Sequence, residues 1–328
     1  MELAPGVYMI KHAYVNSYIL VNEADEGVIL VDTGMPGAEG VILARLRELG
    51  HHAGPDLLLI PGQEITTFHG HANAWGITGW QEFRCWTREQ MQAVREAVRQ
   101  SGALFSINHP KEDGPEWEYQ DYMEADCVEV WCGPWFLSNY QALAYWDQLL
   151  RQGLRPTAVG GSDRHVPPFT GHPDWYDVGT PTTWVYASEL SIPGVLQAIR
   201  AGHVFISQAP NGPRIYLEAD ADGDGVYEVM MGDQVQLPAG ATLPLRCRVQ
   251  GADGSLLRLV TDKETQQMPI AGDDFTHQWE VMGEDYLYVR AEVIEPPEVN
   301  LEEVPEALMM KAMTNPIYFT PGLRAGRG

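Results

Sequence analysis

The sequence predicts an α/β protein in which a barrel or parallel sheet is followed by a small antiparallel β-sandwich. Two observations predict this. Short β-branched strands alternate with amphipathic helices over residues 56–208, and repeated βα units are typical of parallel sheets and barrels. From residue 209 onward, alternating strands separated by turn residues replace the helical periodicity, as in sandwich domains. We therefore divide the chain into residues 1–55, 56–208 and 209–328.

The first segment is expected to form three strands and a helix. The runs "GVYMI", "NSYILV" and "GVILV" are rich in β-branched residues and are separated by turn residues. Between Pro36 and Gly50, leucine and valine recur on one broad side, which predicts a helix that ends at the glycine.

The second segment is expected to supply the barrel. "DLLLIPGQEITT" predicts a buried strand that runs into a loop, and Thr87-x-x-Gln90 is a capping box that opens a helix ending near Gly102. "LFSIN", "CVEVW", "TAVGG", "TTWVYA" and "HVFIS" predict strands, with helices from about Asn139 to Gln152 and over "IPGVLQAIRAG". In such an array, chemistry is expected at the carboxyl ends of the strands.

Composition excludes several classes of partner. The formal charge of -24 and the absence of Lys/Arg clusters exclude nucleic acid, because phosphate binding needs clustered cations. No apolar run approaches the roughly 18–20 residues of a membrane span. The four cysteines lack C-x-x-C spacing and no secretory signal is visible, so we expect buried free thiols and a cytoplasmic location without membrane contact.

Polar side chains able to bind a metal fall at the ends of the predicted strands. Glu64 follows "LLLIPGQ", His109 follows "LFSIN", and Asp163 and His165 follow "TAVGGS". Imidazole and carboxylate ligands suit Zn, Mn or Fe. The alternative is that these residues are helix caps and hydrogen-bonded polar groups of the core.

Five motifs in order resemble the polymerase-and-histidinol-phosphatase (PHP) superfamily, and within it the carbaryl-hydrolase-type branch with its C-terminal sandwich. They are "PGQEITTFHGHANAWG", "INHP", "GGSDRH", "GTPTTWVYA" and "TNPIYFTP", and the resemblance covers about residues 56–328. It implies a PHP-type distorted (β/α)7 barrel. It also implies that the metal ligands are Glu64, His71, His109, Asp163 and His165.

The chain departs from that family at its start. A complete PHP domain opens with an H-x-H strand, whereas no H-x-H precedes residue 69. Residues 1–55 instead resemble the opening ββ-β-α run of a metallo-β-lactamase-fold protein. "HGHA" suits both families, but Asn73 and Ala74 stand where the lactamase motif has Asp and His. We interpret the chain as a fusion, whose grafted strands leave edges that favour a homodimer through residues 1–55.

The missing histidines reduce the expected metal content to one or two divalent ions per chain. Asp32, His12 and His69 are alternative replacements for the lost ligands, and the sequence leaves this choice open. Asp163, His69 and Arg164 are the catalytic candidates. Either His172 or His69 is the candidate general acid, and Arg164 is either a contact for a substrate phosphate or part of a surface ion pair.

The resemblance implies a metal-dependent hydrolase, chiefly a phosphoesterase, that acts on a small-molecule phosphoester or ester with a metal-activated water. One alternative is a metallo-β-lactamase-fold esterase. Another is a non-catalytic binding module with a degenerate metal site. The run "DADGDG" resembles the opening of a calcium loop, but Met231 stands where an EF-hand needs Glu, so we interpret it as a polar turn.

Overall fold

The computed structural model describes residues 2–4, 7–12, 15–22, 27–31, 44, 58, 60–112, 114–119, 122–164, 179–238, 240–282 and 285–320. The described helices are α2 (Arg88–Gln100), α3 (Asn139–Arg151), α4 (Ile192–Ala201) and the 3-10 helix η2 (Pro305–Ala307). The strands are β1 (Glu2–Ala4), β2 (Val7–His12), β3 (Val15–Asn22), β4 (Gly27–Val31), β5 (Gly62–Thr67), β6 (Gly70–Trp75), β7 (Leu104–Ile107), β8 (Cys127–Cys132), β9 (Thr157–Gly161), β10 (Thr182–Val185), β11 (Val204–Ser207), β12 (Arg214–Ala219), β13 (Val229–Met230), β14 (Gln234–Gln236), β15 (Thr242–Gln250), β16 (Leu256–Thr261), β17 (Thr265–Pro269), β18 (Asp274–Met282), β19 (Tyr288–Ile294), β20 (Met310–Thr314) and β21 (Ile317–Thr320).

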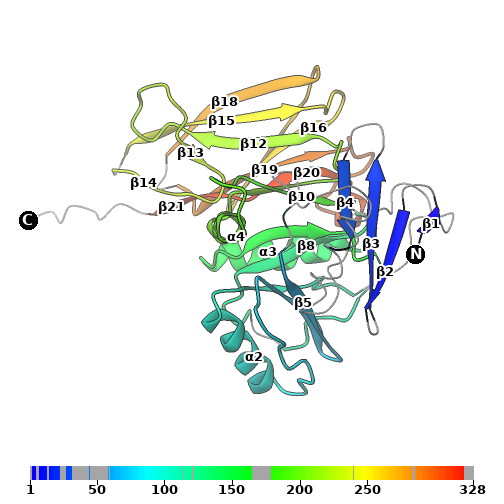
Figure 1. The fold of residues 1–328 in the computed structure, drawn as a ribbon. Coiled ribbons are helices and arrows are strands. Elements are labelled where there is room, and N and C mark those ends of the chain that lie inside the picture. Colours follow the sequence, from blue (N-terminus) through cyan, green and yellow to red (C-terminus); the bar gives the residue numbers. More distant parts are fainter. Residues whose placement is uncertain are drawn as a thin grey trace, which may run out of the picture.

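The expected fold, a (β/α)7 barrel with a grafted N-terminal unit, is wrong. The described strands fall into four sheets, and none of these sheets closes on itself (Figure 1). The sheet that corresponds to the expected barrel has the order β5-β6-β7-β8-β9. Only β7, β8 and β9 are parallel; β5, β6 and β7 pair antiparallel. A (β/α)7 barrel needs a run of parallel strands, so this mixed sheet stays open.

The stretch "GHANAW" explains the difference. We expected it to be a loop after one long strand, but it forms β6 and returns along β5 as a hairpin. Its side chains alternate between buried and half-buried, with Ala72 and Ala74 packed in the core. That period of two is typical of a strand with one buried face. The hairpin reverses the chain, so no crossover helix separates β5 from β6.

The free edge of β9 is held by side chains instead of another strand. Thr183 Oγ1 accepts a hydrogen bond from the Gly160 amide (2.9 Å) and donates to the Gly160 carbonyl (2.6 Å). In the same way, the Asn315 side chain accepts a hydrogen bond from the Ala158 amide and donates one to the Ala158 carbonyl. β10 and β11 pair with each other and, through β11, with β20, so they belong to a different sheet from β9.

The three α-helices confirm their sequence predictions. α2 begins with the predicted capping box, in which Thr87 Oγ1 accepts from the Gln90 amide and Gln90 Oε1 accepts from the Thr87 amide. It buries Met91 and Val98 in the core that also contains β7 and β8. α3 adds buried Trp146 to the same core, and α4 packs against a second cluster with strand residues of β7, β8 and β9.

The strands from β10 onward form two stacked layers, which are antiparallel except for the parallel pair β14–β21 (Figure 1). One layer is β13-β12-β15-β18, and the other is the eight-stranded sheet β10-β11-β20-β19-β16-β17 with β14 and β21. β15 alternates strictly between buried and outward side chains. The core between the layers includes Leu217 and Leu245 from one sheet and Val289, Ala291 and Ile317 from the other.

The N-terminal strands form a separate antiparallel sheet in the order β1-β2-β3-β4. The predicted helix between Pro36 and Gly50 lies outside the described residues except for Ala44, which is helical. The homodimer through residues 1–55 stays a prediction. Among the described residues, no helix is long and apolar enough to cross a membrane. The predicted buried free thiols are confirmed for Cys85, Cys127, Cys132 and Cys247.

Candidate metal centre

The hairpin β5–β6 places Glu64 and His71 on the same face. Along both strands every second residue is buried, and Ile65 and Ala72 point into the core. Glu64 and His71 therefore occupy the opposite face, where Glu64 pairs with Asn73 and Thr66 pairs with His71 across the ladder. Glu64 Oε1 lies 2.9 Å from His71 Nδ1, close enough for a hydrogen bond.

His109 reaches the same place from the end of β7. Because β6 runs antiparallel to β7, the start of β6 lies beside the residues that follow β7, and the Asn108 amide donates to the His71 carbonyl (3.0 Å). The His71 and His109 rings meet edge to face with centroids 5.1 Å apart. Three potential donor atoms, one each from Glu64, His71 and His109, lie within 4.8 Å of one another. We call these three residues the donor cluster.

A buried carboxylate holds the backbone of His109. His109 has φ 28°, in the left-handed region that non-glycine residues seldom adopt. Its amide donates to Glu129 Oε2 (3.0 Å), and Glu129 comes from the middle of β8. Burial and the charge of Asp163 raise the pKa of Glu129 to about 8. Sequence analysis missed Glu129, although a carboxylate inside the apolar run "CVEVW" is a signal that such a residue has a special partner.

The donor cluster opens into a pocket of about 260 Å³. Its other wall carries Lys111, which is buried and donates from Nζ to the carbonyls of Cys132 and Leu137 and to Asn139 Oδ1. An ammonium group carries three N–H donors, and three oxygens at the end of β8 and in the segment that follows it accept hydrogen bonds from it. Lys111 therefore ties down the segment after β8 and keeps a positive charge beside the pocket. The lining consists of Glu64, His71, His109, Lys111, Gly114, Pro115, Cys132, Gly133, Leu137, Ser162 and Asp163.

The protonation states of the donor cluster suit cation binding. Burial lowers the pKa of His109, so its neutral form is favoured. Burial opposes the ionisation of Glu64, but the hydrogen bond from His71 and the charges of His71 and His109 together lower its pKa. A neutral imidazole and an ionised carboxylate are the forms in which these side chains bind metals.

One ring nitrogen of His109 also has the character of a ligand. His109 Nδ1 is buried and has no hydrogen-bond partner among the described residues. Leaving a buried polar atom unpaired costs about 1–3 kcal/mol, so such atoms usually have a partner. Two imidazoles and one carboxylate match the ligand types of Zn and Mn sites. The donor chemistry of these residues therefore fits a divalent metal.

The structure does not bring all predicted site residues into the cluster. Asp163 lines the pocket with φ 46°, and its Oδ2 lies 3.8 Å from Cys132 Sγ, but it does not belong to the three-donor group. Arg164 follows it and is half-buried outside the lining. His165 and His172 lie outside the described residues. His69 occupies the β5–β6 turn, where its Nδ1 lies 2.7 Å from Glu118 Oε2, and it does not line the pocket.

The other candidate ligands are not placed at the cluster. Asp32 lies outside the described residues, as does the side chain of His12 at the end of β2. The "DADGDG" run forms hydrogen-bonded turns, as expected, but Asp220, Asp222 and Asp224 also make up a second group of potential metal donors within 4.8 Å of one another. Both oxygens of Asp220 accept backbone amide bonds, from Gly223 (2.7 Å) and Gly225 (2.9 Å).

Comparison with known proteins does not assign the chain to a family. No protein-family model matches the sequence, and no curated protein matches it. The PHP and metallo-β-lactamase resemblances therefore stay predictions.

Proposed function

We propose that this protein is a metal-dependent hydrolase that acts on small phosphate esters, with Glu64, His71 and His109 as metal ligands. The observation that carries the proposal is the convergence of these three donors at the wall of a pocket, with His109 Nδ1 buried and without a hydrogen-bond partner among the described residues. A bound divalent cation would lower the pKa of a coordinated water and polarise a phosphoryl or carbonyl oxygen.

The residues around the ligands support this function. Glu129 accepts a hydrogen bond from the His109 backbone amide and so fixes the main chain from which the imidazole extends. The buried ammonium of Lys111 provides a positive charge near a bound phosphoryl group. Asp163 lines the same pocket and adds a carboxylate of the type that serves as a metal ligand or as a proton acceptor.

The test is metal content measured by mass spectrometry after incubation with Zn or Mn and removal of excess metal. Wild type is expected to retain about one or two ions per chain, and a His109→Ala/Asp163→Ala double variant to lose them. The matched control is Asp222→Ala/Asp224→Ala, which disrupts the other group of neighbouring carboxylates and is expected to leave the content unchanged. A wild-type protein that stays metal-free would overturn the proposal and favour a binding module.

Hydrolysis is tested separately with activated phosphate mono-, di- and triesters and with a carboxylic ester that has the same leaving group. We expect turnover of at least one phosphate ester by the metal-loaded wild type and none by the His109→Ala/Asp163→Ala variant. Faster turnover of the carboxylic ester would replace the phosphoesterase assignment with an esterase.

A further inference from the structure

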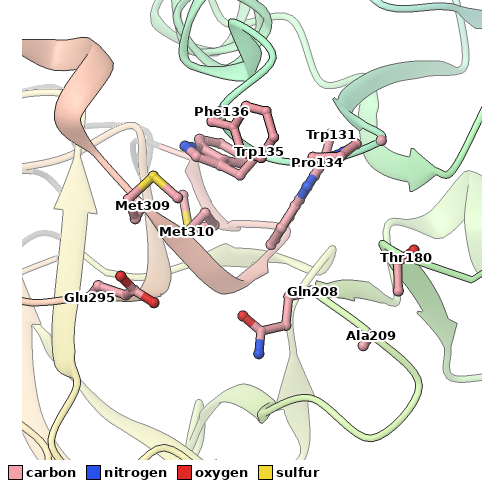
Figure 2. A pocket seen from close by; sticks show the side chains of 11 residues that line it. Trp131, Pro134, Trp135, Phe136, Thr180, Gln208, Ala209, Glu295, Met309 and Met310 are labelled. Carbon is pink, nitrogen blue, oxygen red and sulfur yellow. The ribbon is translucent and has the colours of Figure 1, made fainter. Parts of the chain in front are cut away.

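A second pocket, of about 420 Å³, lies where the segment after β8 meets the eight-stranded sheet (Figure 2). We call it the junction pocket. Trp135 and Phe136 follow β8, Gln208 follows β11, and Glu295 follows β19. Ligand pockets commonly form at such junctions between structural units. The full lining is Trp131, Gly133, Pro134, Trp135, Phe136, Thr180, Gln208, Ala209, Glu295, Met309 and Met310.

One wall of the junction pocket is aromatic and rigid. The rings of Trp131 and Trp135 pack edge to face with centroids 4.9 Å apart, and both residues are almost fully buried. Trp135 Nε1 donates to the Leu308 carbonyl (2.6 Å), which fixes the indole. Phe136 beside them is 56% exposed. Aromatic rings attract a cation placed over their faces, most strongly in the case of tryptophan.

The opposite side of the pocket is acidic. Figure 2 shows Glu295 and Gln208 across from the aromatic side chains. Among the described residues that line the pocket, Glu295 is the only one with an ionisable side chain, since no described Lys, Arg, His or Asp belongs to the lining. Lys311 Nζ lies 3.8 Å from Glu295 Oε1 but also donates to Ser255 Oγ (3.3 Å) and is not part of the lining. The chain's net charge of -24 adds a long-range attraction for cations.

We propose that the junction pocket binds a small organic cation of the quaternary-ammonium class, between the aromatic wall and the Glu295 carboxylate. Such a cation has no N–H donor and is weakly hydrated, so its methyl groups pack against aromatic rings at a small desolvation cost. Met309 and Met310 complete the surface with polarizable thioethers. The Glu295 carboxylate on the far side offsets the cost of moving the positive charge of the ligand out of water.

The junction pocket is adjacent to the pocket of the donor cluster. Gly133 lines both, and the 133–137 segment contributes Phe136 to one and Leu137 to the other. On the proposed hydrolase function, this adjacency makes the junction pocket the subsite for the cationic part of the substrate. Binding of the cation itself does not depend on that function.

The experiment is calorimetric titration of the full chain with choline and with 3,3-dimethyl-1-butanol, its neutral isostere, each with and without EDTA. We expect choline to bind and the neutral alcohol to bind at least about tenfold more weakly. Glu295→Gln is expected to weaken choline binding by about tenfold, and Phe136→Leu by a smaller factor. Glu298→Gln, which removes the same charge outside the pocket, is the matched control and is expected to bind like wild type.

Equal affinity for the two probes, an unchanged affinity in Glu295→Gln, or no heat with millimolar choline would each overturn the proposal. EDTA removes divalent metal, so choline binding that persists in EDTA does not depend on the donor cluster. The cation site can then be confirmed even if the hydrolase proposal is wrong. Circular dichroism of each variant verifies that the fold is intact.

Discussion

Asn315 and Ala158 are joined by two hydrogen bonds that take the place of a strand. Asn315 Oδ1 accepts from the Ala158 amide (2.7 Å), and its Nδ2 donates to the Ala158 carbonyl (3.0 Å). Nδ2 also donates to the Val204 carbonyl (2.9 Å). The Asn315 side chain thus makes the hydrogen bonds to the Ala158 amide and carbonyl that a neighbouring strand would make at the edge of a larger sheet. This relationship joins the open β5–β9 sheet to the sandwich.

Replacing Asn315 with Ala is expected to destabilise the protein by about 2 kcal/mol or more, because it leaves the buried backbone amide and carbonyl of Ala158 without their side-chain partner. Urea unfolding measures the change. Asn300→Ala removes an exposed amide and is the control, with an expected loss below about 1 kcal/mol. Equal losses in the two variants would show that the Asn315 contacts contribute nothing special.

Gly114→Ala tests the donor cluster without removing a ligand. A Cβ at this position lies 3.0 Å from His109 Nδ1, so the imidazole must move. We expect zinc affinity to fall by about tenfold or more, the effect usual for disturbing a ligand through its neighbours. Gly79→Ala is the matched control because no atom lies within 4 Å of its added Cβ. Competition with a chromophoric chelator gives both affinities, and equal values would contradict the assignment of His109.

Asp147→Asn tests an ionic contact between α3 and β19. Burial opposes the ionisation of Asp147, but hydrogen bonds and charge from Arg290, Tyr288 and Arg151 together lower its pKa. Because the pKa of Asp147 is lower in the folded than in the unfolded protein, its ionised form contributes to stability at pH values above the unfolded pKa of about 4. This contribution is lost as the pH falls through the folded-state pKa. We expect a loss of about 1–3 kcal/mol at pH 7 that shrinks at pH 2–3. Urea unfolding at both values measures it, and a loss independent of pH would exclude the ionic explanation. Asp222→Asn, at an exposed carboxylate, is the control.

Thr87→Ala tests the capping box of α2. Its hydroxyl accepts the Gln90 amide bond, and removing it is expected to destabilise the protein by about 1 kcal/mol. Thr87→Ser keeps the hydroxyl and is expected to retain most of the stability. Thermal unfolding of the three proteins gives the comparison, and a serine variant as unstable as the alanine variant would contradict the capping role.

The sequence by itself determined the elements whose signals are local. The capping box at Thr87 and the apolar periodicity of α2 lie within a few turns of chain, so the helix was predictable. The ends of β7 and β9 were predictable as well, and this brought His109 and Asp163 to the edge of one pocket, because these strands are indeed parallel to β8. The residue types at those ends also indicated the metal chemistry that we now propose.

Only the tertiary structure decided how the strands pair. The turn at Phe68 and His69 sends β6 back along β5. The further pairing of β6 with β7 depends on contacts between distant segments that no short window of sequence contains. For the same reason, Glu129 was recognisable as an unusual residue but not as the partner of the His109 amide, 20 positions away. The barrel prediction was wrong because β6 pairs antiparallel with both β5 and β7. The contact of Asn315 with the edge of β9 was equally out of reach, since Asn315 lies 157 positions from Ala158.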